Sequence, residues 1–292
     1  MKPRLEAARC ALCGGTEADV FLSSWGESRV VRCRKDGLLY LDPRPAEADF
    51  QQTVAGHVPN MDMYTRRRRA ALRREARALE ERVAGGAWLD VGCSVGTLLE
   101  QLDPDRWERH GVELSVAAAR TARQRTGAEI FCGQLADAGY EDDSFDVITV
   151  LDSIYFFHDL GQALAEIRRC LKPGGILAVE IQGLSYWLVR DRGPLCLALS
   201  GRWTRPSSRL YYFSRATLTA VLEAAGFEIL EWLPEQASVG GGRLLDGVNE
   251  VHFTAAKLAW RLSGGRVSIA GRELYMAVKA GGPYPPPVES SG

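Results

Sequence analysis

Apolar and polar residues alternate along the middle of the chain with two different periods. Short continuous apolar runs predict strands, and apolar residues at every third or fourth position predict helices. The predicted strands cover residues 87–91, 109–113, 129–132, 145–151, 176–181, 227–232 and 273–279. The predicted helices cover residues 64–83, 96–101, 116–125, 161–171 and 214–225. This alternation indicates an α/β fold with a doubly wound, mostly parallel sheet.

Three segments depart from the alternation. Residues 10–45 are rich in cysteine and turn residues and carry short alternating runs, which predict small antiparallel strands. Residues 183–210 are irregular and aromatic, and an interruption of this length in an α/β domain is typical of a lid or binding loop. The Pro- and Ser-rich residues 282–292 predict a disordered tail.

Charge and composition limit the partners and the setting. Lys and Arg number 36 against 37 Asp and Glu, which gives no reason to expect a nucleic-acid or membrane partner. No apolar run is long enough to span a membrane and the N-terminus lacks a signal-peptide pattern, so the cytoplasm is the expected location. Cys93, Cys132 and Cys170 are scattered and are expected to be reduced thiols.

A glycine-bearing turn follows the first strand of the predicted core. Residues 89–99 read as a strand, a small-residue turn with Gly92 and Gly96, and a helix start. Glycine lets the backbone approach a ligand closely, and a helix start directs free N–H groups at that point. Glu113 ends the next strand, where its carboxylate can accept hydrogen bonds from two ribose hydroxyls. A nucleoside cofactor is expected here, although a tight turn without a ligand would also use glycine.

Two classes of cofactor fit a glycine turn followed by an acid. Nicotinamide sites favour G-x-G-x-x-G, whereas Ser94 and Thr97 occupy the second and third glycine positions here. Asp90 ends the strand, where its charge would repel a pyrophosphate and suit a ligand with an ammonium and a sulfonium. S-adenosylmethionine (SAM) is therefore favoured, and a nicotinamide-dependent oxidoreductase is the alternative.

Three segments in order carry a family resemblance. Residues 89–99 resemble motif I of the class I SAM-dependent methyltransferases, and residues 144–148 and 171–175 resemble their later motifs. The resemblance covers residues 64–280 and implies a Rossmann-like, seven-stranded sheet with SAM as cosubstrate. It implies a cofactor site made of Asp90, Gly92, Cys93, Gly96, Glu113, Leu114, Gln134, Leu135 and Asp152. Gln134 and Leu135 would meet the adenine, and Asp152 would lie near the cofactor's amino group.

Methyl transfer from a sulfonium is an in-line displacement, so a base is needed only when the acceptor must lose a proton. Tyr155 and Phe156 stand where many relatives have Glu-His, which removes the usual acid and imidazole. His158 is the first candidate base and Tyr155 the second. The alternatives are a surface histidine and a packing tyrosine, or a protein that binds the cofactor without catalysing a reaction.

Aromatic and basic residues suggest acceptor contacts. Tyr186, Trp187, Trp203, Tyr211 and Tyr212 are expected to cover a small acceptor or to pack the insertion. Residues 66–69 together with Arg73, Arg74 and Arg77 would attract a phosphate or carboxylate, or form a solvated helix face.

The N-terminal cysteines have the spacing of a two-knuckle zinc ribbon. Cys10 and Cys13 form the first pair, and Cys33 and Asp36 form the second, with Asp36 in the fourth ligand position or His57 in its place. The segment, with the Pro-Arg-Pro that follows it, resembles the zinc-binding N-terminal segment of some sugar C-methyltransferases and related natural-product enzymes. A metal-free knuckle is the alternative, because one thiolate is missing.

Together these patterns predict six segments and one activity. The segments are a zinc-ribbon-like part at 1–50, a helical linker at 51–84, the cofactor-binding core at 85–182, a substrate-cover insertion at 183–212, the rest of the core at 213–281 and the tail at 282–292. The expected activity is methyl transfer to a small molecule, such as a sugar or a natural-product intermediate.

Overall fold

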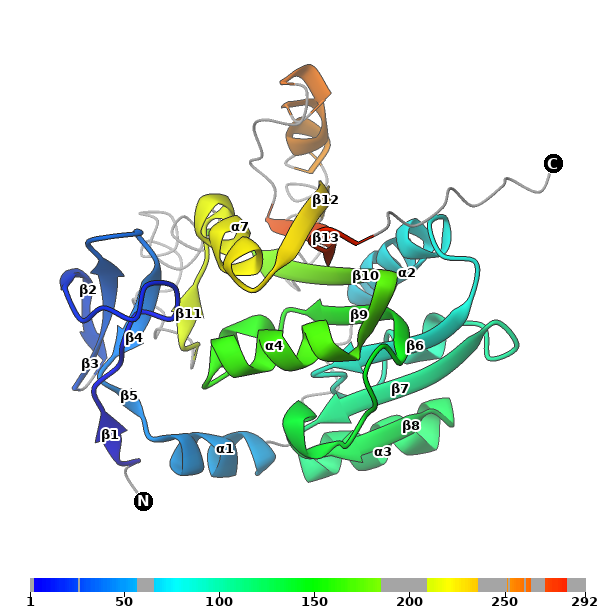
Figure 1. Ribbon diagram of the computed structural model, residues 1–292, viewed down its shortest axis with the longest axis horizontal. Coiled ribbons are helices and arrows are strands. Elements are labelled where there is room, and N and C mark those ends of the chain that lie inside the picture. The colour runs from blue at the N-terminus through cyan, green and yellow to red at the C-terminus, as the bar shows by residue number, and fades with distance from the viewer. Residues whose placement is uncertain are drawn as a thin grey trace.

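The computed structural model describes residues 3–25, 27–56, 66–184, 209–235, 251, 253–259, 261–263 and 271–282 (Figure 1). Their strands form sheets of seven, four and two strands. The predictions for Tyr186, Trp187, Trp203, His57 and the tail from residue 283 fall outside the described residues. No helix in the described ranges is long and apolar enough to cross a membrane.

The seven-stranded sheet is the centre of the molecule. In spatial order its strands are β12 (Phe227–Glu235), β13 (Arg272–Lys279), β10 (Leu171–Gln182), β9 (Phe145–Leu151), β6 (Gly86–Val91), β7 (Trp107–Glu113) and β8 (Glu129–Cys132). β13 is antiparallel to both neighbours, and the strands from β10 to β8 are parallel. This confirms the predicted mostly parallel, seven-stranded α/β sheet. Strand order reverses between β6 and β9, and a doubly wound sheet binds its ligands at the carboxyl edge of such a point.

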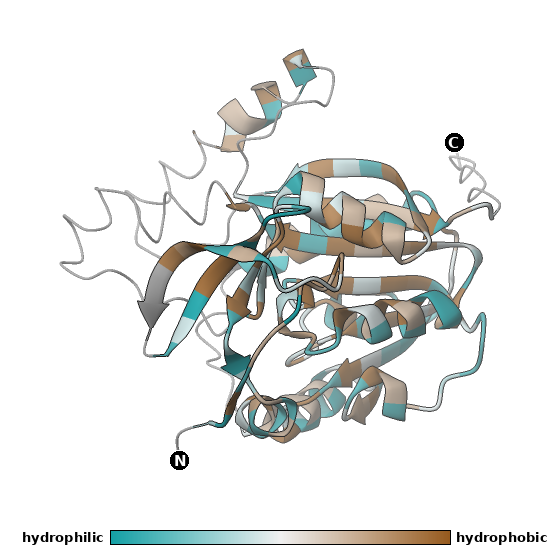
Figure 2. Ribbon diagram, turned by 60° about the vertical axis from the view of Figure 1, so that its left-hand side comes forward, coloured by the Kyte–Doolittle hydropathy of each residue, from teal (hydrophilic) through white to brown (hydrophobic). Residues whose placement is uncertain are grey.

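Helices cover both faces of this sheet (Figure 1). One face carries α2 (Arg66–Glu80), η2 (Leu99–Gln101) and α3 (Val116–Thr126), which share a core with Trp88 and Val147. The other face carries α1 (Glu47–Ala55), α4 (Leu160–Cys170) and α7 (Arg215–Ala224), which share a core with Leu89 and Ile148. Successive strand residues face opposite sides of a sheet, so a strand covered on both faces is almost wholly apolar. Figure 2 shows the hydrophobic residues along these layers.

Local sequence explains most helix limits. Ser115 accepts a hydrogen bond from the Ala118 N–H at the start of α3, and Gly127 ends that helix with a left-handed φ of 65°. Ser214 and Thr217 form a capping box at the start of α7.

Two predicted elements differ from the structure. The helix expected at 96–101 is a turn followed by the short 3-10 helix η2, because Gly96 has a φ of 74° that no right-handed helix contains. The strand expected at 176–181 begins earlier, since β10 starts at Leu171 and has a register shift before Ile176. Two further 3-10 helices, η3 (Leu135–Asp137) and η4 (Ile154–Phe156), follow β8 and β9.

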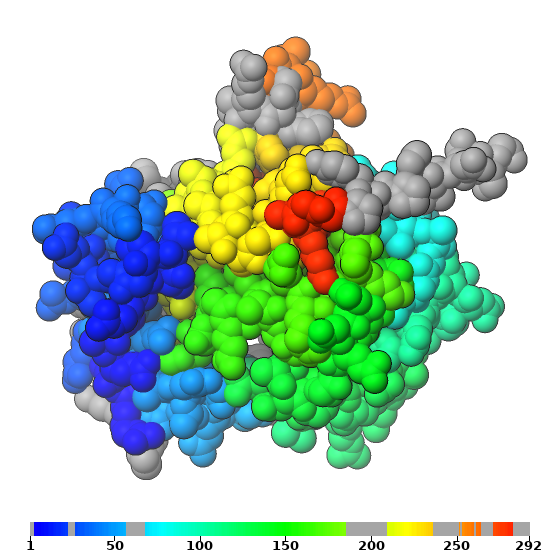
Figure 3. Space-filling view, viewed as in Figure 1, coloured from blue at the N-terminus to red at the C-terminus, as the bar shows by residue number. Residues whose placement is uncertain are grey.

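The N-terminal residues form antiparallel strands, as predicted. The four-stranded sheet has the order β11 (Tyr211–Tyr212), β4 (Leu39–Asp42), β3 (Ser28–Cys33) and β2 (Ala18–Trp25). β1 (Leu5–Glu6) pairs with β5 (Arg44–Pro45). β11 comes from the segment expected to be a substrate cover, yet it pairs with β4 and both of its tyrosines are buried. The N-terminal part is thus joined to the core, as the continuous surface in Figure 3 shows.

Candidate functional site

The turn after β6 is tied to the ends of both neighbouring strands. On one side, the Ser94 N–H donates to Glu113 Oε2 at the end of β7 over 2.9 Å. On the other, the Ser153 hydroxyl, just beyond β9, donates to the Val91 carbonyl over 2.8 Å. The predicted cofactor turn therefore lies where strand order reverses, between the ends of β7 and β9.

Two glycines shape this turn, and both have a left-handed backbone. A Cβ on Gly92, with φ of 79°, would lie 2.6 Å from Ser153 Cβ. A Cβ on Gly96 would lie 2.8 Å from Thr126 Cγ2. The close approaches that require glycine here are thus to neighbouring parts of the chain, which agrees with the alternative of a tight turn and leaves contact with a ligand a prediction.

Glu113 holds the turn while remaining partly exposed. Its Oε1 accepts the Ser115 N–H over 2.7 Å and its Oε2 accepts the Ser94 N–H. Its own carbonyl accepts the Gly133 N–H over 3.1 Å, which brings the segment after β8 to the same edge. A carboxylate has about four acceptor positions, so it can accept more than two hydrogen bonds.

Asp90 is buried at the carboxyl end of β6 and only 5% exposed. Its Oδ1 accepts the Thr149 hydroxyl over 2.8 Å, and the Thr149 hydroxyl in turn accepts the Trp88 indole N–H over 3.1 Å. Burial raises the pKa of Asp90 to about 7, against the opposing effects of the Thr149 hydrogen bond and the Arg68 charge. A cationic ligand near this carboxyl would favour its ionised form.

The other predicted cofactor residues surround this edge in different ways. Gln134 is exposed at the start of η3, Leu135 is buried, and Leu114 is partly exposed after Glu113. Cys93 is buried, and burial holds the pKa of its thiol well above the ordinary value, so it is neutral. Their contact with a cofactor stays a prediction.

A network of buried charges lies beside Asp90, and sequence analysis missed it. Glu180 of β10 accepts both guanidinium nitrogens of Arg68 over 2.8 and 2.7 Å and one of Arg272 over 2.9 Å. Arg272 also pairs with Asp152 over 2.9 Å. These two arginines lower the pKa of Glu180 to about 2, although its burial opposes them. Arg68 is therefore neither on a solvated face nor placed to meet a substrate, the two roles expected of its segment.

One signal for this network was present in the sequence. Glu180 interrupts the apolar run of β10, and a carboxylate in a strand buried on both faces needs a cationic partner. The partners were not predictable, because Arg68 and Arg272 lie far from Glu180 along the chain.

The two candidate bases make structural contacts. The Tyr155 hydroxyl is buried and accepts the Gln182 N–H, and burial raises its pKa. His158 faces the N-terminal part: its Nε2 lies 3.1 Å from the Pro45 carbonyl and 3.5 Å from Glu6 Oε1. Neither ring is hydrogen-bonded to the predicted cofactor residues in the described part of the chain. Their role as bases stays a prediction.

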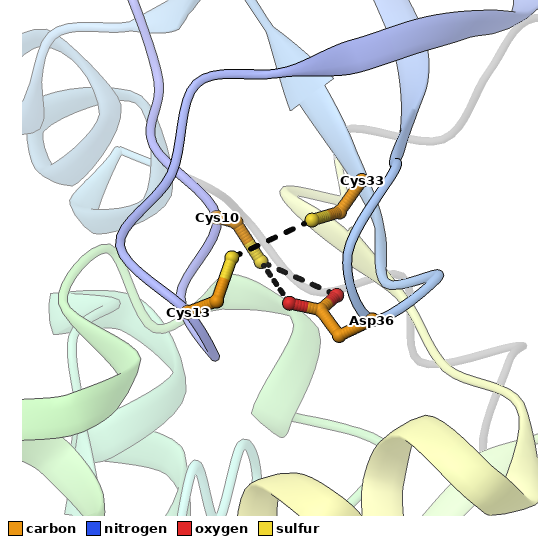
Figure 4. A group of neighbouring side chains, drawn as sticks. All are labelled: Cys10, Cys13, Cys33 and Asp36. Carbon is orange, nitrogen blue, oxygen red and sulfur yellow. Dashed lines mark hydrogen bonds between the residues drawn. The ribbon is translucent and has the colours of Figure 1, made fainter.

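The predicted metal ligands converge (Figure 4). Donor atoms of Cys10, Cys13, Cys33 and Asp36 all lie within 4.8 Å of one another. The two knuckles share one backbone pattern, because Cys10 N bonds Gly15 O as Cys33 N bonds Leu38 O, both over 2.9 Å. The Leu38 N–H binds Asp36 Oδ1 over 2.9 Å, while Asp36 Oδ2 lies 3.1 Å from Cys10 Sγ.

A surface hollow of about 210 Å³ lies at the opposite edge of the sheet, among Trp107, His110 and Glu129. Trp107 and Glu129 begin β7 and β8, and His110 is the fourth residue of β7, so the hollow lies at the amino ends of these strands. The hollow holds none of the residues described above, so we assign it no role.

Comparisons with known proteins agree on one family. The profile of the methyltransferase-domain family matches residues 63–231, more than half of the chain. Methyltransferase GfsG of Streptomyces halstedii is 36% identical over 110 residues, which are 33% of this chain and 37% of that protein. A dTDP-sugar N,N-dimethyltransferase of Streptomyces venezuelae is 31% identical over 96 residues, 32% of this chain and 40% of that protein. The chain thus spans less than half the length of these relatives.

Solved structures support the fold. The PH0226 protein of Pyrococcus horikoshii superposes with a TM-score of 0.51 at 20% identity, over 75% of this chain and 93% of that chain. A Listeria monocytogenes structure described as a SAM-dependent methyltransferase gives a TM-score of 0.52 at 14% identity, over 73% of this chain and 98% of that chain.

Proposed function

This chain belongs to the methyltransferase-domain family, and from that premise we propose that it is a SAM-dependent methyltransferase that methylates a small molecule. The observation that carries the proposal is the position of residues 209–212. The Leu210 N–H donates to the Tyr155 carbonyl just beyond β9, and β11 joins the N-terminal sheet. The cofactor edge is thereby bordered by a second sheet, which suits a small acceptor better than a macromolecular surface.

We assign the cofactor to the edge between β6, β7 and β9. Glu113 would accept the ribose hydroxyls while it holds Ser94, and Asp90 would supply negative charge for the cationic end of SAM. Thr97, which follows the turn, supports this assignment. Its buried hydroxyl has no hydrogen-bond partner among the described residues, and buried polar groups normally have one. Membership of the methyltransferase-domain family argues against the alternative of a nicotinamide-dependent oxidoreductase.

The chemical step then requires mainly position and the exclusion of water. The nucleophile of the acceptor must lie in line with the methyl group and the sulfur, and burial of the pair removes competing solvent. We propose that Tyr155 contributes to this by packing, since its hydroxyl already accepts a backbone N–H.

The acceptor proposal is tested by transfer from radiolabelled SAM. A metabolite extract is divided by ultrafiltration, and both fractions are incubated with the enzyme. We expect label in the low-mass fraction, with a product heavier than its precursor by one methyl group. Label confined to protein or nucleic acid would overturn the proposal, and no transfer from any fraction would favour the inactive cofactor-binding alternative.

We further propose that the N-terminal knuckles hold a structural zinc ion through Cys10, Cys13, Cys33 and Asp36. The donor set fits, because zinc takes four thiolate, imidazole or carboxylate ligands in structural sites. Without a cation, burial and the neighbouring Asp36 raise the pKa of Cys10 and keep its thiol protonated, and a divalent ion would reverse this effect.

Metal analysis of the purified protein tests the zinc proposal. We expect about one zinc per chain and its loss in Cys33→Ser. Cys170→Ala, which changes a buried thiol of α4 outside the cluster, should retain the metal. If the protein is folded but contains no zinc after growth with zinc, the metal-free knuckle is correct instead.

A further inference from the structure

Asp152 anchors two arginines at the carboxyl edge beside the predicted cofactor site. It follows β9 with a left-handed φ of 59°. Its Oδ2 accepts Arg272 Nη2 over 2.9 Å, and its Oδ1 lies 3.4 Å from Arg209 Nη2. A carboxylate therefore holds one guanidinium at short distance and the other loosely.

Arg68 and Arg272 are paired with buried or partly buried carboxylates. Arg68 forms two hydrogen bonds with Glu180, and Arg272 is shared between Glu180 and Asp152. Glu75 is also buried, and burial raises its pKa well above the ordinary value, so its neutral form is favoured. Its Oε1 lies 3.6 Å from Arg68 Nη1, and no ion pair joins Glu75 to Arg209 among the described residues.

Asp152 is shared between Arg209 and Arg272, and it lies closer to Arg272. It therefore offsets the charge of Arg209 only in part. A partly buried guanidinium attracts an anion more strongly than an exposed one does.

Arg209 packs against Tyr155 and is about as buried as Arg68 and Arg272. Its guanidinium carbon lies 4.0 Å from the centre of the buried Tyr155 ring, and 12% of its side chain is exposed. The next residue, Leu210, bonds the Tyr155 carbonyl and accepts the Leu41 N–H, both over 2.9 Å. Among the described residues the five N–H donors of Arg209 meet one carboxylate, at 3.4 Å.

We propose that Arg209 binds an oxyanion of the acceptor, a carboxylate or a phosphate, and so selects acidic acceptors. The planar guanidinium presents paired donors that match both groups. The cation–π contact holds the guanidinium over the Tyr155 ring, and its N–H donors would bind the anion. This inference rests on the proposed small-molecule function and adds the chemical class of its substrate.

Anion binding is tested directly on the enzyme saturated with S-adenosylhomocysteine. Sodium phosphate and sodium acetate are titrated at constant ionic strength against chloride, and the Arg209 Nε–H signal, assigned by its absence in Arg209→Gln, is followed by NMR. We expect a saturable shift with one of the two anions, and the responding anion identifies the group. Arg120→Gln, which changes an exposed arginine on α3, should leave the response intact. No shift, or the same shift in chloride, would overturn the proposal.

The acceptor itself provides the second test. The metabolite extract is separated on an anion exchanger before reaction, and we expect acceptor activity in the retained fraction; a phosphatase removes it if the group is a phosphate. Arg209→Gln should raise the KM for this fraction about 10- to 100-fold and leave SAM affinity unchanged. Activity in the unretained fraction alone would refute the role of Arg209 but not the methyltransferase function. Failure of S-adenosylhomocysteine to bind would instead refute the assigned cofactor site.

Discussion

Replacing Asp90 by asparagine should stabilise the protein above neutral pH. The folded protein holds the pKa of this buried carboxyl at about 7, against an ordinary value of 3.8. Because the folded state binds the proton more tightly, the contribution of Asp90 to stability falls as pH rises from about 4 to about 7 and is constant above. The full difference corresponds to about 4 kcal/mol.

Asparagine keeps the Thr149 hydrogen bond through its carbonyl oxygen and never ionises. The difference in unfolding free energy between Asp90→Asn and the wild type should therefore grow from near zero at pH 4 to as much as about 4 kcal/mol at pH 8. Urea unfolding followed by circular dichroism at several pH values measures it. Asp137→Asn, at an exposed carboxylate in η3, should show no such trend. A constant difference across this range would refute the buried-carboxyl argument.

The same titration affects the cofactor. Since a cationic ligand favours the ionised carboxylate, SAM affinity should fall as pH drops below 7, by about tenfold per unit at most. Calorimetric titrations of the wild type and Asp90→Asn with SAM at several pH values separate the titration of Asp90 from that of other groups. The variant should bind SAM more weakly at pH 8 and with little dependence on pH, whereas a parallel pH dependence would assign the proton to another residue.

Three further substitutions test individual contacts. Glu113→Ala should weaken SAM binding by about 1 to 3 kcal/mol in a calorimetric titration, and unchanged affinity would remove it from the ribose site. Gly92→Ala should lower the unfolding free energy by about 1 to 3 kcal/mol, because the left-handed backbone and the contact with Ser153 both resist a Cβ; a wild-type urea midpoint would contradict this. His158→Ala should cost about 1 kcal/mol of stability through the lost Pro45 contact and leave the pH profile of turnover unchanged, whereas loss of a basic limb would identify His158 as the base.

Periodicity and capping were sufficient to predict the central sheet. The apolar run of β9 has the composition of a strand covered on both faces, and the structure places it inside the sheet. Ser214 predicted the start of α7, and the capping box lies there. Local chemistry decides both features, so both are readable from neighbouring residues.

Long-range contacts were not predictable in this way. β11 pairs with β4 although nearly the whole core separates them along the chain, and two residues carry too little periodicity to predict a strand. Helical spacing placed Arg68 on a helix, but only the tertiary arrangement places it opposite Glu180. At the turn, the sequence identified the glycines, whereas their left-handed backbone and their contacts with Ser153 and Thr126 depend on how the chain packs.

A crystal structure with S-adenosylhomocysteine tests the central claim most directly. We expect the compound between the Gly92 turn and the end of β7, with its ribose hydroxyls on the Glu113 carboxylate. Density for the compound at another place, or a vacant edge in crystals grown under saturating ligand, would contradict the assigned site.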